Sequence, residues 1–424
     1  MNKKAVMRHS QTRFPVGRKS IILATCGTRG DVQPMAAIAL ALQSAGHKVQ
    51  LIGPPENAAW VEDLGCPYKG VGQDVSAFVS TFDRPVSIYS GLSFVRFVMQ
   101  ELAWQLKYLP QIIASADLVI GSSLMFGLSS TAEAQGIPYR YIAFTPQVLP
   151  SKHHPFLPIQ TQTLPPLVNR LTWTMADILD RGSLTLLINR YRKRQKLAPV
   201  CGAWNHILGP QTIVAGDKEI APVPPDVRKK VIQTGYPHLD QPVLPNPDLD
   251  RFLETGEKPV YAGFGSMPAK SQENAVPLLV RAAKTLGRRI IIRHPKKMDR
   301  KYLADKAVFF IGDYPHHALF PRMAAVIHHG GAGTTAAAAA AGVPQVIVPH
   351  ILDQHYHGHR IFLSGLGPAP IPLSQLTEDR LSRSLAHCLT NGRIIQSARN
   401  TGRTIDPAHR LEILVKAVLA PLIP

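Results

Sequence analysis

Short apolar runs alternate with helix-forming stretches along most of the chain. In the N-terminal half the apolar runs are SIILAT, HKVQLIG, ADLVIGSS and IPYRYIAF, and the stretches between them include MAAIALALQSAG, a helix that Gly46 closes, and FGLSSTAEAQG. The segment GTRGDVQP, between the first strand and the first helix, is expected to be a loop. Strands that alternate with helices in this way predict a parallel, doubly wound α/β sheet.

A second series of the same kind follows a change of composition near residue 235. The stretch YPHLDQPVLPNPDLDRFLETGEKP is rich in proline and acidic residues and has little periodicity, so it is predicted to be a linker. After it come the apolar runs PVYAGFGS, RRIIIRH, AVFFIGDY, MAAVIHH and PQVIVPH, again with helical stretches between them. The sequence therefore predicts two α/β domains, 20–235 and 257–424, joined by a linker over 236–256. Ligands of such sheets bind at the carboxyl ends of the strands, so the cleft between the domains is the expected site.

Length and charge are consistent with two domains and an acidic partner. The chain has 424 residues, of which 45% are hydrophobic, and this is too long for one ordinary core. Its formal net charge of +19 favours phosphorylated small molecules, anionic membrane surfaces or nucleic acid as partners. A nucleic-acid-binding protein would explain the charge, but no aromatic-basic repeat or known module supports that interpretation, so no nucleic-acid partner is expected.

The cysteines and the N-terminus suggest a cytoplasmic protein. Cys26, Cys66, Cys201 and Cys388 are far apart in sequence and form no CxxC pair, so we expect them to be reduced and structural. Residues 1–19 are basic but contain no apolar signal core, which predicts a disordered arm. No uninterrupted apolar run approaches the roughly 18 residues that a membrane-spanning helix needs.

The segment HHGGAGTT, residues 328–335, is the strongest candidate for an anion site. It follows the strand MAAVIHH and precedes the alanine-rich helix TTAAAAAAG, so the first N–H groups of that helix have no helical partner and face the expected cleft. Glycines let the backbone approach a phosphate closely, threonines add hydroxyl groups, and a histidine adds a donor whose charge follows that of the ligand. The alternative is a strand-to-helix turn that binds nothing.

Two other phosphate motifs are absent from the sequence. No GxxxxGK[ST] occurs, which argues against a P-loop NTPase. GFGSMP and GTRGDV each match only part of the GxGxxG of dinucleotide-binding folds, and no well-placed acid follows the strand HKVQLIG, which argues against a nicotinamide oxidoreductase.

The sequence resembles a known family in three places. The stretch DYPHHALFPRMAAVIHHGGAGTTAAAAAAGVPQVIVPHILDQ, with GTRGDVQP near the N-terminus and PVYAGFGSM at the start of the second domain, is similar to the family 1 nucleotide-sugar glycosyltransferases. Within that family it looks most like the branch of sterol glucosyltransferases, bacterial antibiotic glycosyltransferases and rhamnolipid-type enzymes. The resemblance covers roughly residues 20–420. It implies a GT-B fold, in which two Rossmann-like domains face each other, with the sugar nucleotide on the C-terminal domain and the acceptor on the N-terminal one.

The resemblance also assigns donor-binding roles to individual residues. The diphosphate would be held by Ser266, His329, Gly331, Gly333, Thr334 and Thr335. Asp353 and Gln354 would bind the hydroxyl groups of the sugar, a task that suits a carboxylate and an amide. Asp313, Tyr314 and His316 would line the pocket for the base, although the aromatic residue that stacks on uracil in plant enzymes is not at its usual place.

Asp31, in GTRGDVQP, is the candidate catalytic base. It aligns with the aspartate proposed as base in this branch, and it would take the proton of the acceptor hydroxyl while the diphosphate leaves from the opposite face. A free aspartate has a pKa near 3.9 and is a poor base at pH 7, so we expect burial in the cleft to raise the pKa of Asp31. The alternative is that Asp31 only caps the helix that follows it.

A histidine cluster in DQHYHGHR presents a competing metal hypothesis. The spacing of His355 and His359 places two imidazoles on one helical face, as a zinc pair needs, with His357 between them. Asp353, which would complete the set, already has a role in the donor site, so a donor-site or surface role for these histidines is favoured over a metal site. The resemblance implies no metal and no cofactor, since enzymes of this fold generally use helix N-termini and side chains for the leaving diphosphate.

The acceptor side is the least defined part of the sequence. Residues 76–115 carry many apolar and aromatic side chains at helical spacing, which either line an apolar acceptor pocket or pack as ordinary core. The run NRYRKRQK, residues 189–196, is either a solvated basic face or a contact with anionic lipid.

Together these features predict an inverting glycosyltransferase that moves glucose from UDP-glucose to a hydroxyl of a sterol-like or other lipid alcohol. The second hypothesis is transfer to a polyketide, peptide antibiotic or hydroxy-fatty acid, with a TDP-sugar as donor. A non-catalytic GT-B binding protein is a further alternative, which the presence of Asp31, His329, Asp353 and Gln354 disfavours.

Overall fold

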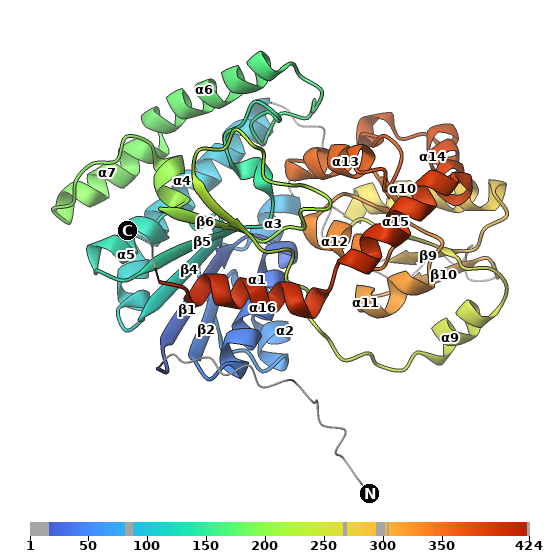
Figure 1. The fold of residues 1–424 in the computed structure, drawn as a ribbon, viewed down its shortest axis with the longest axis horizontal. Helices are drawn as coiled ribbons and strands as arrows, with labels where there is room; N and C mark the ends of the chain where they lie inside the picture. Colours follow the sequence, from blue (N-terminus) through green and yellow to red (C-terminus); the bar gives the residue numbers. More distant parts are fainter. Residues whose placement is uncertain (1–16, 81–87, 266–268, 294–301, 303–304, 422–424) are drawn as a thin grey trace, which may run out of the picture.

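The computed structural model describes residues 17–80, 88–265, 269–293, 302 and 305–421. It consists of two α/β units that lie side by side, each built on its own parallel sheet (Figure 1). The predicted basic arm falls mostly, and Ser266 entirely, outside the described residues. No helix within the described ranges has the length and apolar character that a bilayer crossing requires.

The first sheet has seven strands among the described residues, all parallel, in the order β3-β2-β1-β4-β5-β6-β7. The strands are β1 Ser20–Cys26, β2 Lys48–Gly53, β3 Tyr68–Gly70, β4 Leu118–Ser123, β5 Tyr139–Ala143, β6 Gln211–Val214 and β7 Lys230–Gln233. The strand order reverses between β1 and β4, whose last residues Cys26 and Ser123 pair directly. This edge of the sheet is therefore a crevice where ligands of doubly wound folds bind.

Helices cover both faces of the first sheet (Figure 1). They are α1 Arg29–Ser44, α2 Ala58–Asp63, α3 Val75–Ser80, α4 Ile88–Ile113, α5 Leu128–Ala134, α6 Pro166–Gly182, α7 Leu184–Arg194 and α8 Ala203–Ile207. One apolar core contains Leu102, Leu106 and Leu109 of α4, and the other contains Met35, Ile38 and Leu42 of α1. Both faces of the strands are thus buried, which explains their continuous apolar sequences.

The second sheet is also parallel and follows the order β10-β9-β8-β11-β12 within the described residues. Its strands are β8 Val260–Gly263, β9 Ile290–Arg293, β10 Val308–Ile311, β11 Ala325–His328 and β12 Gln345–Ile347. Its helices are α10 Ala269–Thr285, α11 His316–Leu319, α12 Ala332–Ala340, α13 Asp353–Leu363, α14 Glu378–Thr390 and α15 Gly392–Thr404. Here the order reverses between β8 and β11, where Gly263 pairs with His328. The two predicted doubly wound sheets are confirmed.

One local prediction was wrong. The segment GTRGDVQP is not all loop, because α1 already begins at Arg29. The predicted linker contains the short helix α9 (Pro247–Glu254), whose start is capped by the Asn246 side chain and has Pro247 at its first position. In both places capping residues at the right spacing start a helix among glycine or proline residues.

The last helix differs from the predicted domain division. Residues 257–424 were assigned to the second domain, yet α16 (Pro407–Leu419) returns to the first and packs beside α1 (Figure 1). Leu414, Val415 and Val418 lie in the same core as Ile21 and Leu23 of β1. The chain therefore crosses between the two units twice, once through the linker and once before α16.

Candidate active site

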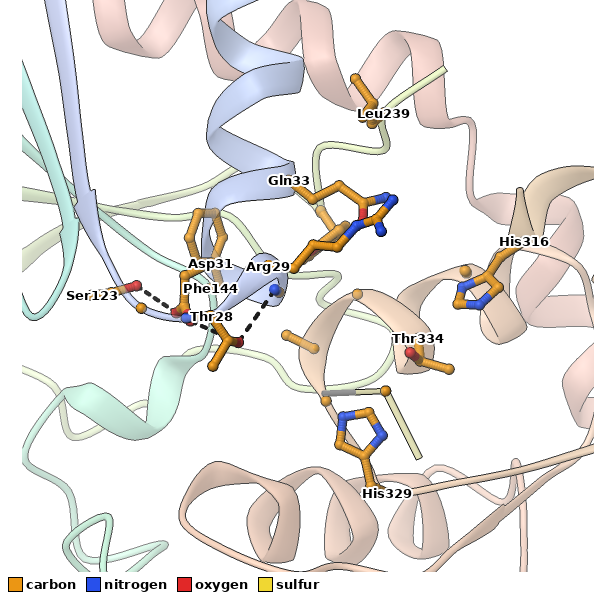
Figure 2. A pocket seen from close by; sticks show the side chains of 18 of the residues that line it. Thr28, Arg29, Asp31, Gln33, Ser123, Phe144, Leu239, His316, His329 and Thr334 are labelled. Carbon is orange, nitrogen blue, oxygen red and sulfur yellow. Dashed lines mark hydrogen bonds between the residues drawn. The ribbon is translucent and has the colours of Figure 1, made fainter. Parts of the chain in front are cut away.

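A cleft of about 920 Å³ lies between the two units. Residues that follow β1 and β4 line one side, and residues that follow β8 and β11 line the other, so the crevices of the two sheets open into one space. Figure 2 shows Asp31 and Ser123 on one side and His329, Thr334 and His316 on the other. The cleft expected from the sequence is present, and it is large enough for a ligand of several hundred daltons.

Asp31 occupies the third position of α1, where two hydrogen-bond donors hold its carboxylate. Thr28 is the N-cap, and its backbone N–H donates to Asp31 Oδ2 over 2.8 Å. On the other side the Ser123 hydroxyl donates to Asp31 Oδ1 over 2.6 Å (Figure 2). Asp31 is therefore not the N-cap that the alternative hypothesis assumed, but part of a capping box with Thr28. The carboxylate lines the cleft with lone pairs still unused.

Burial raises the pKa of Asp31 from its ordinary value of 3.8 to about 6. Desolvation is the largest cause, and the Asp353 carboxylate across the cleft raises the pKa further. The hydrogen bonds from Ser123 and Thr28 act in the opposite direction, since they stabilise the ionised form. Desolvation thus prevails, as the sequence predicted, and the carboxylate can accept a proton near neutral pH.

Gly27 and Ser123 show that the position of Asp31 is tightly set. A Cβ at Gly27 would lie only 2.2 Å from Asp31 Oδ2, so a side chain there would displace the carboxylate. Ser123 has a φ of 52°, in the left-handed region that non-glycine residues seldom adopt. Strained backbone of this kind is typical of functional sites. Ser123 was not predicted from the sequence; its place at the end of β4 indicates that it lies near the switch point, but not that its hydroxyl binds Asp31.

The turn HHGGAG delivers the N-terminus of α12 to the cleft. Gly331 is the N-cap, and because glycine has no side chain, it cannot cap the first N–H groups of the helix. The first helical hydrogen bond runs from the Thr335 N–H to the Gly331 carbonyl, so the N–H groups of Ala332, Gly333 and Thr334 have no helical partner. These residues line the cleft. Such a helix end attracts anions through its free donors and its dipole.

Two histidines brace this turn from behind. His328 Nδ1 accepts the Gly330 N–H over 3.1 Å, and His357 Nδ1 donates to the Gly330 carbonyl over 2.8 Å. His357 is buried and lies 3.7 Å from an oxygen of Asp353. Within the described residues no group of three or more histidine, cysteine, aspartate or glutamate side chains is arranged to hold a metal ion. His357 therefore has a structural task that the metal hypothesis for His355, His357 and His359 did not foresee.

His329 lies at the cleft between two glycines. A Cβ at Gly331 would come within 2.5 Å of His329 Nε2, and one at Gly265 within 2.7 Å of its Cε1, so the imidazole needs both glycines. Its Nδ1 is buried and has no hydrogen-bond partner among the described residues. Burial and the neighbouring histidines hold the pKa of His329 well below its usual range. The His329 ring is therefore neutral at pH 7 in the free protein.

The two predicted threonines have different positions. Thr334 lines the cleft, as expected. Thr335 is only 2% exposed and does not line the cleft, because its side chain points to the buried side of α12. The predicted hydroxyl contact of Thr335 with the diphosphate is thus not supported by its geometry.

Asp353 and Gln354 form the first turn of α13 and both line the cleft. Gln354 Oε1 accepts the backbone N–H groups of His350 (2.8 Å) and Ile351 (3.1 Å), so it fixes the preceding loop. Leu352, between that loop and Asp353, has a φ of 48°. Burial raises the pKa of Asp353, and the nearby His357 partly opposes this. The carboxylate of Asp353 thus faces the cleft opposite Asp31.

An ion-pair network connects the two units at the edge of the cleft. Asp313 accepts a hydrogen bond from Arg29 of the first unit, and its other oxygen lies 2.9 Å from Arg293 Nη2 of the second. Tyr314 and His316 line the cleft next to it, and the His316 ring stacks on Phe320 with centroids 4.3 Å apart. Asp313 is therefore engaged in a contact between the units, which its sequence position did not reveal.

The cleft is apolar on the side of the first unit. Val75, Leu124, Val148, Leu157 and three phenylalanines of the predicted acceptor segment, Phe78, Phe94 and Phe97, line it. Other apolar residues of that segment, such as Leu102 and Leu109, are core, whereas Val95 is exposed. Part of the segment 76–115 thus lines the cleft and part of it is core, and its role in binding an acceptor stays a prediction.

Comparisons with known proteins agree with this geometry. Residues 21–153 match the Glycosyltransferase family 28 N-terminal domain, and residues 278–404 match the C-terminal domain of Erythromycin biosynthesis protein CIII-like proteins. The chain is 34% identical over 417 residues to a vancomycin aglycone glucosyltransferase of Amycolatopsis orientalis, an alignment that covers 94% of this chain and 97% of the relative. It is 30% identical over 441 residues to a sterol 3-beta-glucosyltransferase of Arabidopsis thaliana, covering 93% and 68% of the two chains.

Solved structures resemble the whole fold. The calicheamicin glycosyltransferase CalG4 superimposes with a TM-score of 0.71 at 17% identity, covering 96% of this chain and 100% of that one. The glycosyltransferase VinC in complex with DTDP superimposes with a TM-score of 0.65 at 19% identity, covering 94% and 99%. The arrangement of two facing α/β domains is therefore shared with enzymes of the GT-B fold.

Proposed function

The chain belongs to the glycosyltransferases that combine a family 28 N-terminal domain with an EryCIII-like C-terminal domain in the GT-B fold, and we propose that it transfers glucose from UDP-glucose to a hydroxyl of a lipophilic acceptor with inversion. One observation carries this proposal. The Asp31 carboxylate on the first domain faces, across one cleft, the N–H groups at the start of α12 on the second. A base and an anion site thus lie on opposite sides of the same space.

The proposed reaction uses these two sides together. The acceptor oxygen attacks the anomeric carbon, the bond from that carbon to the diphosphate oxygen breaks, and Asp31 takes the proton of the acceptor hydroxyl. The negative charge that develops on the leaving diphosphate is stabilised by the N–H groups of Ala332, Gly333 and Thr334 and by His329. Asp353 and Gln354 line the same cleft, and in this proposal they bind the sugar between these two sides.

Glucose and a lipophilic acceptor are supported by separate observations. Two relatives that act on different acceptors, a vancomycin aglycone and a sterol, are both named glucosyltransferases. The phenylalanines on the first-domain side of the cleft would bind an apolar acceptor. The competing proposal, a TDP-sugar transferred to an antibiotic-type acceptor, is favoured by the VinC complex with DTDP and by a relative named dTDP-epi-vancosaminyltransferase, 30% identical to this chain.

A panel of sugar nucleotides tests the donor. We expect the highest kcat/KM with UDP-glucose, measured as nucleoside diphosphate release in the presence of a sterol or another lipid alcohol. Reactions without acceptor give the background of donor hydrolysis. A clear preference for TDP-sugars would reject UDP-glucose in favour of the competing proposal.

We also propose that transfer needs no metal ion, because a helix N-terminus and His329 already provide donors for the diphosphate. The rate is expected to persist in the presence of EDTA, measured on enzyme that has been dialysed against the chelator. Loss of activity that zinc or magnesium restores would contradict this, and would make His355, His357 and His359 the first residues to substitute.

A further inference from the structure

Helix α6 carries an apolar stripe that faces away from the protein. The stripe consists of Leu167, Val168, Leu171, Met175, Ile178 and Leu179, whose side chains are between 38% and 78% exposed. Their spacing of three and four residues places them on one face of the helix, over about 18 Å of its length. An exposed run of large apolar side chains on this scale is unusual for a surface helix and indicates a binding surface.

The opposite face of α6 explains why the stripe points outward. Asn169 is buried and donates to the carbonyl groups of Lys152 and Leu164. Trp173, also buried, donates from Nε1 to the His154 carbonyl over 3.2 Å and packs edge-on against Phe156. The helix is thus held to the domain through Asn169 and Trp173. The stripe lies on the other side of the helix, where its residues stay 38% to 78% exposed.

A basic cluster lies on the next helix of the same arm, α7, which follows α6 along the outer edge of the first domain (Figure 1). Between residues 166 and 196 the sequence has seven lysines and arginines but only two aspartates and no glutamate. Arg192 is buried in an ion pair with Glu133, 2.7 Å apart, so it is not available to a partner. The basic cluster, by contrast, is exposed and consists of Arg190, Lys193 and Arg194 of α7 and of Lys196 just after this helix.

We propose that the apolar stripe of α6 and the basic cluster of α7 dock the enzyme on an anionic lipid bilayer. An outward apolar helix face together with lysine and arginine side chains matches the acyl and anionic headgroup layers of such a surface. A second copy of the chain fits less well, because it would bring the same basic cluster and a chain of net charge +19 against an equally basic partner. Charge complementarity therefore selects the membrane.

The helix that carries the stripe follows closely in sequence on residues that line the cleft. Leu157, Pro158 and Gln160 line the cleft, and α6 begins at Pro166, six residues further along the chain. An acceptor dissolved in the bilayer would therefore enter near the apolar side of the cleft. Docking does not depend on which acceptor is used, so activity on a detergent-dispersed acceptor tests the proposed function separately.

Co-sedimentation with lipid vesicles tests the proposal. The full-length enzyme is expected to bind vesicles that contain phosphatidylglycerol and to bind pure phosphatidylcholine vesicles at least 10-fold more weakly. The triple substitution L171Q/M175Q/I178Q should abolish measurable binding. R190Q/K193Q/R194Q should lower the partition coefficient about 100-fold, and added salt should weaken the binding of the wild type.

Matched substitutions elsewhere serve as controls. F362Q/L363Q removes exposed apolar side chains from α13, and R393Q/R399Q/R403Q removes the same charge from α15. Both controls should bind vesicles nearly as wild type does, and circular dichroism should show that every variant is folded. The proposal is overturned if the wild type does not bind anionic vesicles or if the α6 variant binds them unchanged. A self-association in analytical ultracentrifugation that the α6 substitutions abolish would equally overturn it, since the stripe would then be covered by a second copy.

Discussion

Replacing Asp31 by asparagine is expected to lower turnover by about 10² to 10⁴, the usual contribution of general-base catalysis. Asparagine keeps the size of the side chain and can still accept the Thr28 N–H, but it cannot take the proton of the acceptor hydroxyl. The affinity for nucleoside diphosphate should hardly change, because α12 belongs to the other domain. Steady-state kinetics and calorimetry on this one variant measure both quantities.

The pH dependence gives an independent check on Asp31. With a pKa near 6, the base is ionised above that pH, so kcat/KM of the wild type should rise through about pH 6 and then level off.

The raised pKa of Asp31 also affects folding stability. The folded protein holds this proton more tightly than the unfolded chain, so the stability that Asp31 contributes at low pH is lost as the pH rises from about 4 to 6. Asp31→Asn removes a carboxylate that opposes folding at pH 8. The melting temperature at that pH should therefore not fall.

A purely structural role for Asp31 predicts the opposite pattern. Loss of the charge at the start of α1 would then lower the melting temperature slightly and leave the rate unchanged. Asp406→Asn is a suitable control, because Asp406 caps α16 through the N–H groups of Ala408 and His409 and lies outside the cleft. A rate for Asp31→Asn within about threefold of wild type would remove Asp31 from the catalytic role.

His329→Ala is expected to weaken the binding of UDP or TDP by about 10- to 100-fold, the usual effect of losing a hydrogen bond to a charged group. The pKa of His329 lies well below its usual range in the free protein, and a diphosphate beside the ring would raise it. The complex should therefore take up a proton, and affinity should increase as the pH falls. Calorimetry in two buffers with different ionisation enthalpies measures this uptake.

His355→Ala is the matched control for this variant. His355 is also buried and lies on α13, but it does not line the cleft. Nucleotide affinity and proton uptake should remain as in the wild type. Unchanged affinity in His329→Ala, or the same proton uptake without the imidazole, would contradict the assigned role.

The sequence predicted the sheets well because their strands are buried on both faces. SIILAT, ADLVIGSS and MAAVIHH are continuous apolar runs, and each becomes a strand at or beside a switch point. The approximate positions of Asp31 and the HHGGAG turn followed from this, since residues after such strands meet at one edge. The local pattern of the chain was therefore sufficient to locate the cleft.

Other features depend on contacts that local patterns do not contain. Nothing near Ser123 in sequence indicates that its hydroxyl binds Asp31, 92 residues away. Thr334 and Thr335 are adjacent and chemically alike, and only the rotation of α12 places one at the cleft and buries the other. The start of α1 is different, because the T-x-x-D spacing of Thr28 and Asp31 is a recognisable capping box that the neighbouring glycine and proline concealed.

The return of α16 to the first domain affects the order in which the protein is made. Leu414, Val415 and Val418 complete a core whose other members, such as Ile21 and Leu23, are translated first. While the second domain is being synthesised, the ribosome-bound first domain therefore exposes the apolar surface of α1 that α16 later covers. The nascent first domain cannot reach its native packing until α16 has left the ribosome, and in that interval we expect it to bind chaperones that recognise exposed apolar surface.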